Sequence, residues 1–170
     1  MRSVYPGLPA ARAAAADFSG DYGFWYPSVL IADFHSAFAP VHSYRFDLAP
    51  RLLRLLGLDA THGVEMFALF DSLDLPLARA MTSLGGREPY AAAGERMRAY
   101  WLDFAEDGRV ADTWPLYDVN RRSTLIIDED DRIEEDPHRA RRRAWGLFLP
   151  ELSGGLRLWS GQVAASGRSA

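Results

Sequence analysis

The tetrapeptide His62-Gly63-Val64-Glu65 holds the residue types that could move a proton. An imidazole titrates near neutral pH and can act as a general base and then as a general acid. Gly63 lets the backbone turn sharply beside it, and Glu65 would lie in the first turn of a helix, where the helix dipole favours a carboxylate. A histidine in a turn is more often structural than catalytic, so the tetrapeptide alone leaves both roles open.

The segments on either side predict where this histidine lies. Before it, the rings of His42, Tyr44 and Phe46 alternate with their neighbours over Val41–Asp47, which is the pattern of a half-buried strand. After it, the apolar residues at 64, 67, 68 and 70 have helical spacing. His62 is therefore expected in a loop between strand and helix, at the carboxyl edge of a sheet, where loops on a rigid scaffold often carry reacting groups.

The rest of the chain predicts more helices than strands. Periodicity and turn signals give helices at 11–17, 50–57, 76–84, 88–107 and 137–148, and strands at 123–128 and 132–135. Asp21 is a candidate cap for a further helical segment reaching Phe38, with Pro27 near its true first turn. The helix at 88–107 has an apolar stripe made of Met97, Tyr100, Trp101 and Phe104.

Several separated motifs follow one another in a specific order. They are Asp21-Tyr22-Gly23-Phe24-Trp25-Tyr26-Pro27, Tyr44-Arg45-Phe46-Asp47, Ala60-Thr61-His62-Gly63-Val64-Glu65, Trp101-Leu102-Asp103-Phe104-Ala105-Glu106-Asp107-Gly108, Trp114-Pro115-Leu116-Tyr117, Asp136-Pro137 and Arg143-Ala144-Trp145. Each motif alone is unspecific. As an ordered set they resemble the carboxyl-terminal portion of a type-B carboxylesterase, in the α/β-hydrolase family of cholinesterase- and p-nitrobenzyl esterase-like proteins.

The resemblance implies a fold and a role for His62. The expected fold class is α/β, the C-terminal part of an α/β-hydrolase fold, helix-rich with a few strands of the central sheet. We expect residues 1–152 to belong to that domain and 153–170 to form a disordered tail. His62 matches the catalytic histidine of a carboxylic-ester hydrolase, which takes a proton from a nucleophilic serine and needs no cofactor.

The other parts of such a catalytic site are missing from the sequence. The serine is expected on a G-x-S-x-G elbow upstream of the histidine. Ser83 has Met81 where the first glycine belongs, Ser153 has Glu151 there, and both follow His62. The serines upstream lack the glycine pair, the upstream carboxylates fall within the matched motifs, and no glycine-rich oxyanion loop is present.

The sequence leaves two functional hypotheses open. In the first, the chain is a fragment that is inactive alone and acts on a small-molecule carboxylic ester when the missing N-terminal part completes it. In the second, it is a non-catalytic remnant or a protein-interaction module, with self-association through an exposed sheet edge. The sequence reveals neither the acyl or alcohol preference nor whether Met1 is the native start.

Other candidate sites have simpler explanations. His62 and Glu65 have the i, i+3 spacing of two metal ligands, but Met66 stands where a second histidine would be needed, so no metal site is predicted. A proton relay through His35 and His42 is less plausible than hydrogen-bonded structural histidines, and the same holds for His138.

Two further clusters also have simple explanations. The run Arg141–Arg143 follows the acidic stretch 128–136, which indicates local charge compensation. Several aromatic residues could line an acyl pocket but are expected mainly in the core, namely Phe24, Trp25, Tyr26, Trp101, Trp114 and Tyr117.

Composition narrows the possible partners. The chain has 170 residues, a net charge of −4, 48% hydrophobic and 25% charged residues. The negative charge argues against a nucleic-acid partner, and no apolar run is long enough for a membrane span. Cysteine is absent, and no signal sequence is visible at the first residues, so the cytoplasm is the default location.

Overall fold

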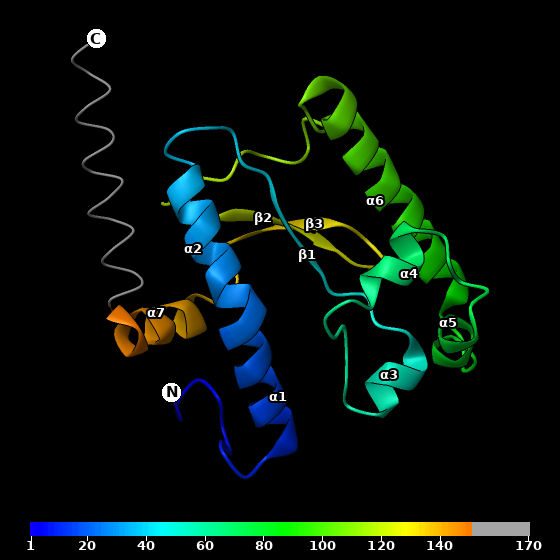
Figure 1. The fold of residues 1–170 in the computed structure, drawn as a ribbon, viewed down its shortest axis with the longest axis horizontal. Helices are drawn as coiled ribbons and strands as arrows, with labels where there is room; N and C mark the ends of the chain where they lie inside the picture. The colour runs from blue at the N-terminus through cyan, green and yellow to red at the C-terminus, as the bar shows by residue number, and fades with distance from the viewer. Residues whose placement is uncertain (151–170) are drawn as a thin grey trace. The chain divides into compact units, whose positions relative to one another are not determined.

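The computed structural model describes residues 1–150, which divide into two units (Figure 1). One unit contains Met1–Ser43, Leu116–Ser123 and the described residues from Glu135 on, and the other contains Tyr44–Pro115 and Thr124–Glu134. We call them the terminal unit and the central unit. The predicted tail at 153–170 and the predicted boundary at 152 lie outside the described residues.

The terminal unit is built on a helical rod. Helix α1 (Arg12–Gly20) continues through a π-helical turn, η1 (Asp21–Trp25), into α2 (Tyr26–His35), as the blue rod of Figure 1 shows. Pro27 has no N–H to donate to the turn before it and its ring crowds that turn. The wider π turn directly upstream is where the rod accommodates this.

Two predictions about this rod are wrong. Asp21 does not cap a new helix, since its neighbours on both sides are helical, and α2 ends at His35 rather than at Phe38. The Asp21 carboxylate is instead used in tertiary structure: Oδ2 accepts a hydrogen bond from the Tyr5 hydroxyl at 2.5 Å and pairs with Arg141 at 3.3 Å.

A small aromatic core holds the terminal unit together. Helix α7 (Arg139–Phe148) contributes Trp145, which is fully buried and stacks on Tyr26 with ring centroids 5.8 Å apart. The Trp145 indole Nε1 donates to the Tyr5 hydroxyl at 2.6 Å. Tyr5 thus connects the amino-terminal segment to both the rod and α7.

The central unit holds most of a three-stranded sheet with the order β1-β2-β3. The strands are β1 (Ser43–Phe46), β2 (Ser123–Ile127) and β3 (Arg132–Glu135), and every residue of the middle strand β2 is buried. Its helices are α3 (Arg51–Leu55), α4 (Glu65–Leu69), α5 (Pro76–Met81) and α6 (Arg87–Asp107). The predicted strand at 41–47 and the predicted helices at 50–57 and 76–84 are confirmed in a shorter form, and the predicted helix at 88–107 is confirmed.

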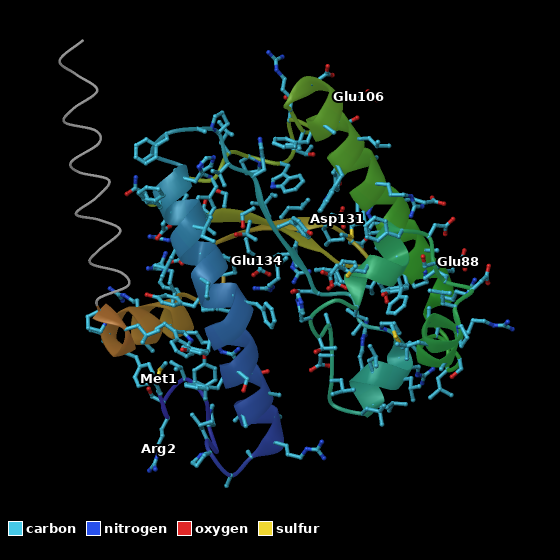
Figure 2. The ribbon with its side chains drawn as sticks, viewed as in Figure 1. Met1, Arg2, Glu88, Glu106, Asp131 and Glu134 are labelled. Carbon is cyan, nitrogen blue, oxygen red and sulfur yellow. The ribbon has the colours of Figure 1, made fainter. Side chains whose placement is uncertain are left out.

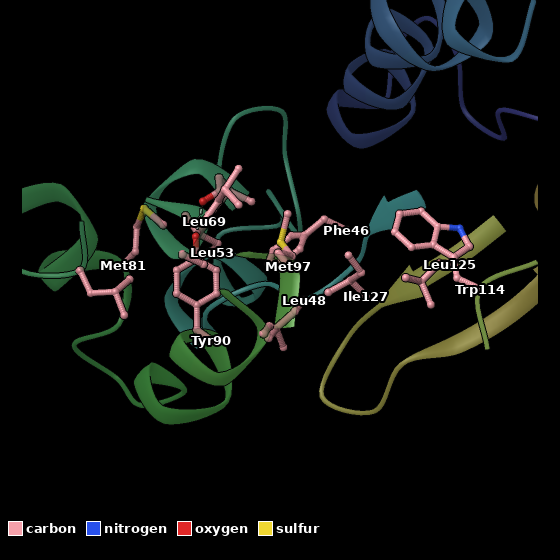
Figure 3. Close-up of a cluster of buried hydrophobic side chains, with 14 residues drawn as sticks. Phe46, Leu48, Leu53, Leu69, Met81, Tyr90, Met97, Trp114, Leu125 and Ile127 are labelled. Carbon is pink, nitrogen blue, oxygen red and sulfur yellow. Dashed lines mark hydrogen bonds between the residues drawn. The ribbon is translucent and has the colours of Figure 1, made fainter. Parts of the chain in front are cut away.

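The core of this unit lies where α6, α4 and the sheet meet. Figure 3 shows Tyr90 and Met97 of α6 among Leu53, Leu69 and Ile127. The predicted stripe on α6 is wrong in its second half, because Trp101 is 48% and Phe104 50% exposed. The buried positions are Tyr90, Ala93, Gly94 and Met97, about two turns earlier along the helix.

Local charge compensation at the arginine run is confirmed only in part. Arg142 and Arg139 pair with Asp136 at 2.6 and 3.0 Å. Arg141 instead reaches Asp17 at 2.7 Å and Asp21, more than a hundred residues earlier in the chain. None of the helices between residues 1 and 150 has the length and apolar character to cross a membrane.

The predicted burial of the aromatic residues is also mixed. Tyr26, Trp114 and Tyr117 are buried, whereas Phe24 and Trp101 are about half exposed.

Candidate functional site

His62 lies in a tight turn directly before α4. The turn runs from Thr61 to Val64 and is closed by the Val64 amide, which donates to the Thr61 carbonyl at 3.2 Å. Gly63 occupies its second central position with φ of +83°, as a type II turn requires. His62 is the first central residue, and its side chain is exposed. The predicted position before a helix is confirmed, whereas the element directly upstream of the turn is helix α3 and not a strand. The exposed imidazole is accessible from solvent.

Helix α4 continues this turn into the core. Glu65 is its first residue, as predicted, and Val64, Ala68 and Leu69 are buried, with Ala68 only 1% exposed. With five residues, α4 is far below the length at which an isolated helix is stable, so tertiary contacts must hold it.

Helix α6 supplies those contacts from three positions spaced four residues apart. The Tyr90 hydroxyl donates a short hydrogen bond to the Val64 carbonyl. A Cβ on Gly94 would lie 2.2 Å from the Ala68 carbonyl oxygen, so the two helices approach closely enough to require glycine. Arg98 Nη1 donates to the Ala68 and Leu69 carbonyls at 2.7 and 3.2 Å, satisfying carbonyls at the end of α4. The i, i+4, i+8 spacing places all three on one face of α6.

The same helix is also fixed to the hairpin of β2 and β3. Arg96 forms a two-pronged pair with Asp131, with Nε–Oδ2 of 3.0 Å and Nη2–Oδ1 of 2.9 Å, and the Tyr100 hydroxyl donates to the same carboxylate at 3.0 Å. Figure 2 labels Asp131 together with Glu88 and Glu106, which come from the first and last turns of α6. Helix α6 therefore connects the hairpin to the element that carries His62.

Burial and the charge of Glu65 act on two tyrosines near α4. Burial, and to a smaller extent the Glu65 carboxylate, raises the pKa of Tyr90 above its ordinary value, and the same two causes raise the pKa of Tyr44. The Tyr90 hydroxyl therefore keeps its proton, and remains a hydrogen-bond donor, near neutral pH.

Among the described residues, His62 is the one whose type and position suit proton transfer. An exposed imidazole on a fixed turn can exchange a proton with a group that approaches from solvent. The sequence offers no serine on an elbow for it to activate. Within residues 1–150 no group of three His, Asp or Glu side chains is arranged to hold a metal ion.

Tyr90, Gly94 and Arg98 do not stand out as site residues in the sequence. Their shared signal is the four-residue spacing of a tyrosine, a glycine and an arginine within the helix predicted at 88–107. Such a glycine costs helix stability, which is a sign that another backbone passes close by.

The chain is similar to known esterases over most of its length. It is 32% identical over 126 residues, 72% of its length, to a para-nitrobenzyl esterase of Bacillus subtilis strain 168. It is 27% identical over 143 residues to an acylcarnitine hydrolase of Rattus norvegicus. These alignments cover 25% and 24% of the two relatives, so the chain spans about a quarter of their length. No protein-family model matches it.

Solved structures agree with this result. A thermophilic PNB esterase superposes with a TM-score of 0.70 and 28% identity, covering 83% of this chain and 28% of that protein. The helix-rich architecture with few strands corresponds to the C-terminal part of that fold. The chain thus belongs to the type-B carboxylesterase family of α/β-hydrolases and corresponds to a C-terminal portion of its fold.

Proposed function

We propose that this chain supplies the general base of a carboxylic-ester hydrolase, with His62 as that base. The observation that carries the proposal is the exposed His62 in a turn fixed before α4, in a chain of the type-B carboxylesterase family. The nucleophilic serine, the triad acid and the oxyanion donors would come from outside these 170 residues. The substrate would be a small-molecule carboxylic ester.

The chemistry follows from the position of a base beside a hydroxyl. The imidazole accepts the serine proton while the serine oxygen attacks the ester carbonyl carbon. The resulting imidazolium then gives the proton to the leaving alcohol as the C–O bond breaks, which leaves an acyl-enzyme. Water repeats the sequence with the same base and releases the acid. A positioned base contributes typically about 10²–10⁴-fold to the rate, and only when the nucleophile lies within hydrogen-bond reach.

The first experiment is to sequence the DNA upstream of the Met1 codon and translate all three frames. A serine elbow, an acid and a glycine-rich loop found there would be expressed together with this chain and assayed with p-nitrophenyl butyrate. We expect His62→Ala to lower kcat by at least about 10²-fold. His35→Gln, which changes an exposed histidine of α2, is the matched control and should leave kcat unchanged.

Two outcomes would contradict the proposal. Full activity in the His62→Ala form of the joined protein would show that another group acts as the base. Hydrolysis by the 170-residue chain alone, well above that of its own His62→Ala variant, would show that the nucleophile lies within this sequence.

A second candidate function is binding of another protein, and the exposed apolar side chains favour it. Around α3, α4 and α5 these include Leu55 at 69%, Phe70 at 64% and Leu77 at 59% exposed. Edge pairing through β3 is discouraged, because Arg132, Glu134 and Glu135 place charges on that strand. Light scattering and hydrophobic-dye binding on the purified chain test this candidate: a monodisperse monomer that binds no dye would count heavily against it.

A further inference from the structure

We propose that Tyr90 is a positioning residue for His62, because its buried hydroxyl fixes the Val64 carbonyl at the end of the turn that carries the imidazole. This inference rests on the proposed function, since the orientation of His62 matters to catalysis only if His62 is the base.

The connection from Tyr90 to the imidazole is short. Val64 closes the turn through its amide and receives the Tyr90 hydroxyl at its carbonyl, so both polar groups of its backbone are bound. Only Gly63 separates Val64 from His62 in the chain. Any movement of the Val64 peptide group would rotate the turn and shift the imidazole, whose useful position must be kept within a fraction of an ångström.

Tyr90 itself cannot move easily. Its side chain is 0% exposed, packs edge-on against Phe46 with ring centroids 5.9 Å apart, and belongs to the 21-residue helix α6. That helix is held to the hairpin by the two-pronged pair of Arg96 with Asp131, which does not depend on Tyr100. The Tyr90 hydroxyl is thus a fixed hydrogen-bond donor. Its acceptor lies between a turn and a five-residue helix, which are elements of low stability by themselves.

The other two contacts from α6 act at a different place. Gly94 and Arg98 meet Ala68 and Leu69, one turn further along α4. They determine how closely the C-terminal half of α4 packs against α6. Tyr90 instead binds Val64, at the N-terminal end of α4 next to the His62 turn. Because Tyr90 binds the backbone of the turn itself, we expect it to affect the position of His62 in addition to the stability of the fold.

The test uses the 170-residue chain with isotope-labelled histidine and glycine. Tyr90→Phe keeps the ring and removes only the donor. Tyr100→Phe is the matched control, because it removes a hydroxyl of the same helix that binds Asp131 instead of the turn. His62→Gln assigns the His62 signals.

We expect Tyr90→Phe to shift the His62 ring signals and to lower the Gly63 amide order parameter from about 0.85 towards 0.6 or below. Tyr100→Phe should change neither. Unchanged His62 and Gly63 signals in folded Tyr90→Phe would overturn the inference, since Tyr90 would then contribute packing alone.

A second measurement needs no variant. In the unmodified chain, the Tyr90 hydroxyl proton should exchange slowly with water and show nuclear Overhauser contacts to residues 63–65. A hydroxyl that exchanges too fast to be observed would overturn the inference even if Tyr90→Phe does not fold.

Activity in the joined esterase separates this inference from the proposed function. We expect Tyr90→Phe to lower kcat several-fold with little change in KM. Full activity of His62→Ala would contradict the proposed function, and with it any catalytic role of Tyr90. Loss of activity in His62→Ala, with kcat and His62 signals unchanged in Tyr90→Phe, would remove only the role of Tyr90.

Discussion

Gly63 makes the turn at His62 possible, and its role is conformational. Its φ of +83° lies where side-chain-bearing residues are strained, while a Cβ there would meet no atom within 4 Å. The glycine is therefore needed for its backbone freedom and not for space. This also explains why the histidine and the glycine are adjacent: the turn that presents the first residue depends on the second.

Gly63→Ala should destabilise the chain by about 1–2 kcal/mol, the cost of a side-chain-bearing residue in the left-handed region. Urea unfolding followed by circular dichroism measures this change. Gly63→Asn is the control, because asparagine tolerates the same region, and it should cost clearly less than alanine. Equal stability of the alanine variant and the unmodified chain would show that the turn changes its type without cost.

At the residue scale, the sequence located His62 but not its support. A strand pattern before it and a helix pattern after it are local, so the histidine loop could be predicted from neighbours in the chain. The Tyr90 hydroxyl lies 26 residues from the Val64 carbonyl that it binds. A contact between residues so far apart in the chain produces no periodic pattern in the sequence. A tyrosine within an apolar helix face is also equally consistent with simple core packing.

Among the elements, the contact of α4 with α6 is the one on which the site depends most. Gly94 is the point of closest approach, since an added Cβ would lie 2.2 Å from the Ala68 carbonyl oxygen and 2.6 Å from its carbon. These are backbone atoms of a helix, which cannot turn aside as a long side chain can. The helices must separate to admit even a methyl group.

Gly94→Ala is therefore expected to destabilise the chain by at least about 1–3 kcal/mol, the usual cost of overpacking, although alanine is the better helix former. Gly20→Ala is the matched control within helical backbone, since a Cβ there meets no atom within 4 Å. That substitution should stabilise by about 0.5–1 kcal/mol. Thermal unfolding of the two variants should give shifts of opposite sign, and shifts of the same sign would contradict the close approach.

Long-range partners also explain the errors at the element scale. Asp21 has the residue type of a helix cap, yet its carboxylate binds Tyr5 and Arg141 and the helical rod passes through it. The stripe on α6 was placed too late because Trp101 and Phe104 are large and apolar, although both are about half exposed. Residue type and spacing identify helices, but they do not determine which face another element covers.

At the scale of the whole molecule, exposed apolar side chains occur in both units. Ile31 and Leu147 in the terminal unit are 66% and 85% exposed, and Leu56 in the central unit is 62% exposed. Composition alone gave no sign of this, because 48% hydrophobic residues is ordinary for a globular protein. The family motifs did indicate it, since they match only part of a larger fold whose other layers would cover such faces.

Ion pairs join distant segments of the terminal unit, and Asp136 is the most buried carboxylate among them, with its side chain 3% exposed. It binds Arg142 at 2.6 Å and Arg139 at 3.0 Å on α7, and its amide donates to the Arg122 carbonyl at 3.3 Å. Arg122 in turn binds Asp33 of α2 at 2.8 Å. Asp136 thereby connects the end of the hairpin to α7 and to the segment that reaches α2.

The ionisation of Asp136 should make the stability of the terminal unit depend on pH in the acidic range. Burial alone would raise the pKa of Asp136, but the hydrogen bonds and charge of Arg142, the charge of Arg122 and a hydrogen bond from Arg139 hold it below the ordinary value. Because the pKa of Asp136 is lower in the folded state than in the unfolded state, its ionisation stabilises the fold at pH values above the unfolded-state pKa near 3.9. This stabilisation is lost as the pH falls through the folded-state pKa.

Asp136→Asn, which resembles the protonated acid, should therefore lower the free energy of unfolding by about 3–5 kcal/mol at pH 7. The difference from the unmodified chain should shrink as the pH falls from about 5 to about 2, because both chains then lack the charge. Urea unfolding at a series of pH values measures both quantities. The control is Asp74→Asn, since the Asp74 side chain is 94% exposed and pairs with Arg87 at the surface. This substitution should change the free energy of unfolding little at any pH. A difference for Asp136→Asn that stayed constant over this range would mean that the shape of the side chain, and not its charge, joins these segments.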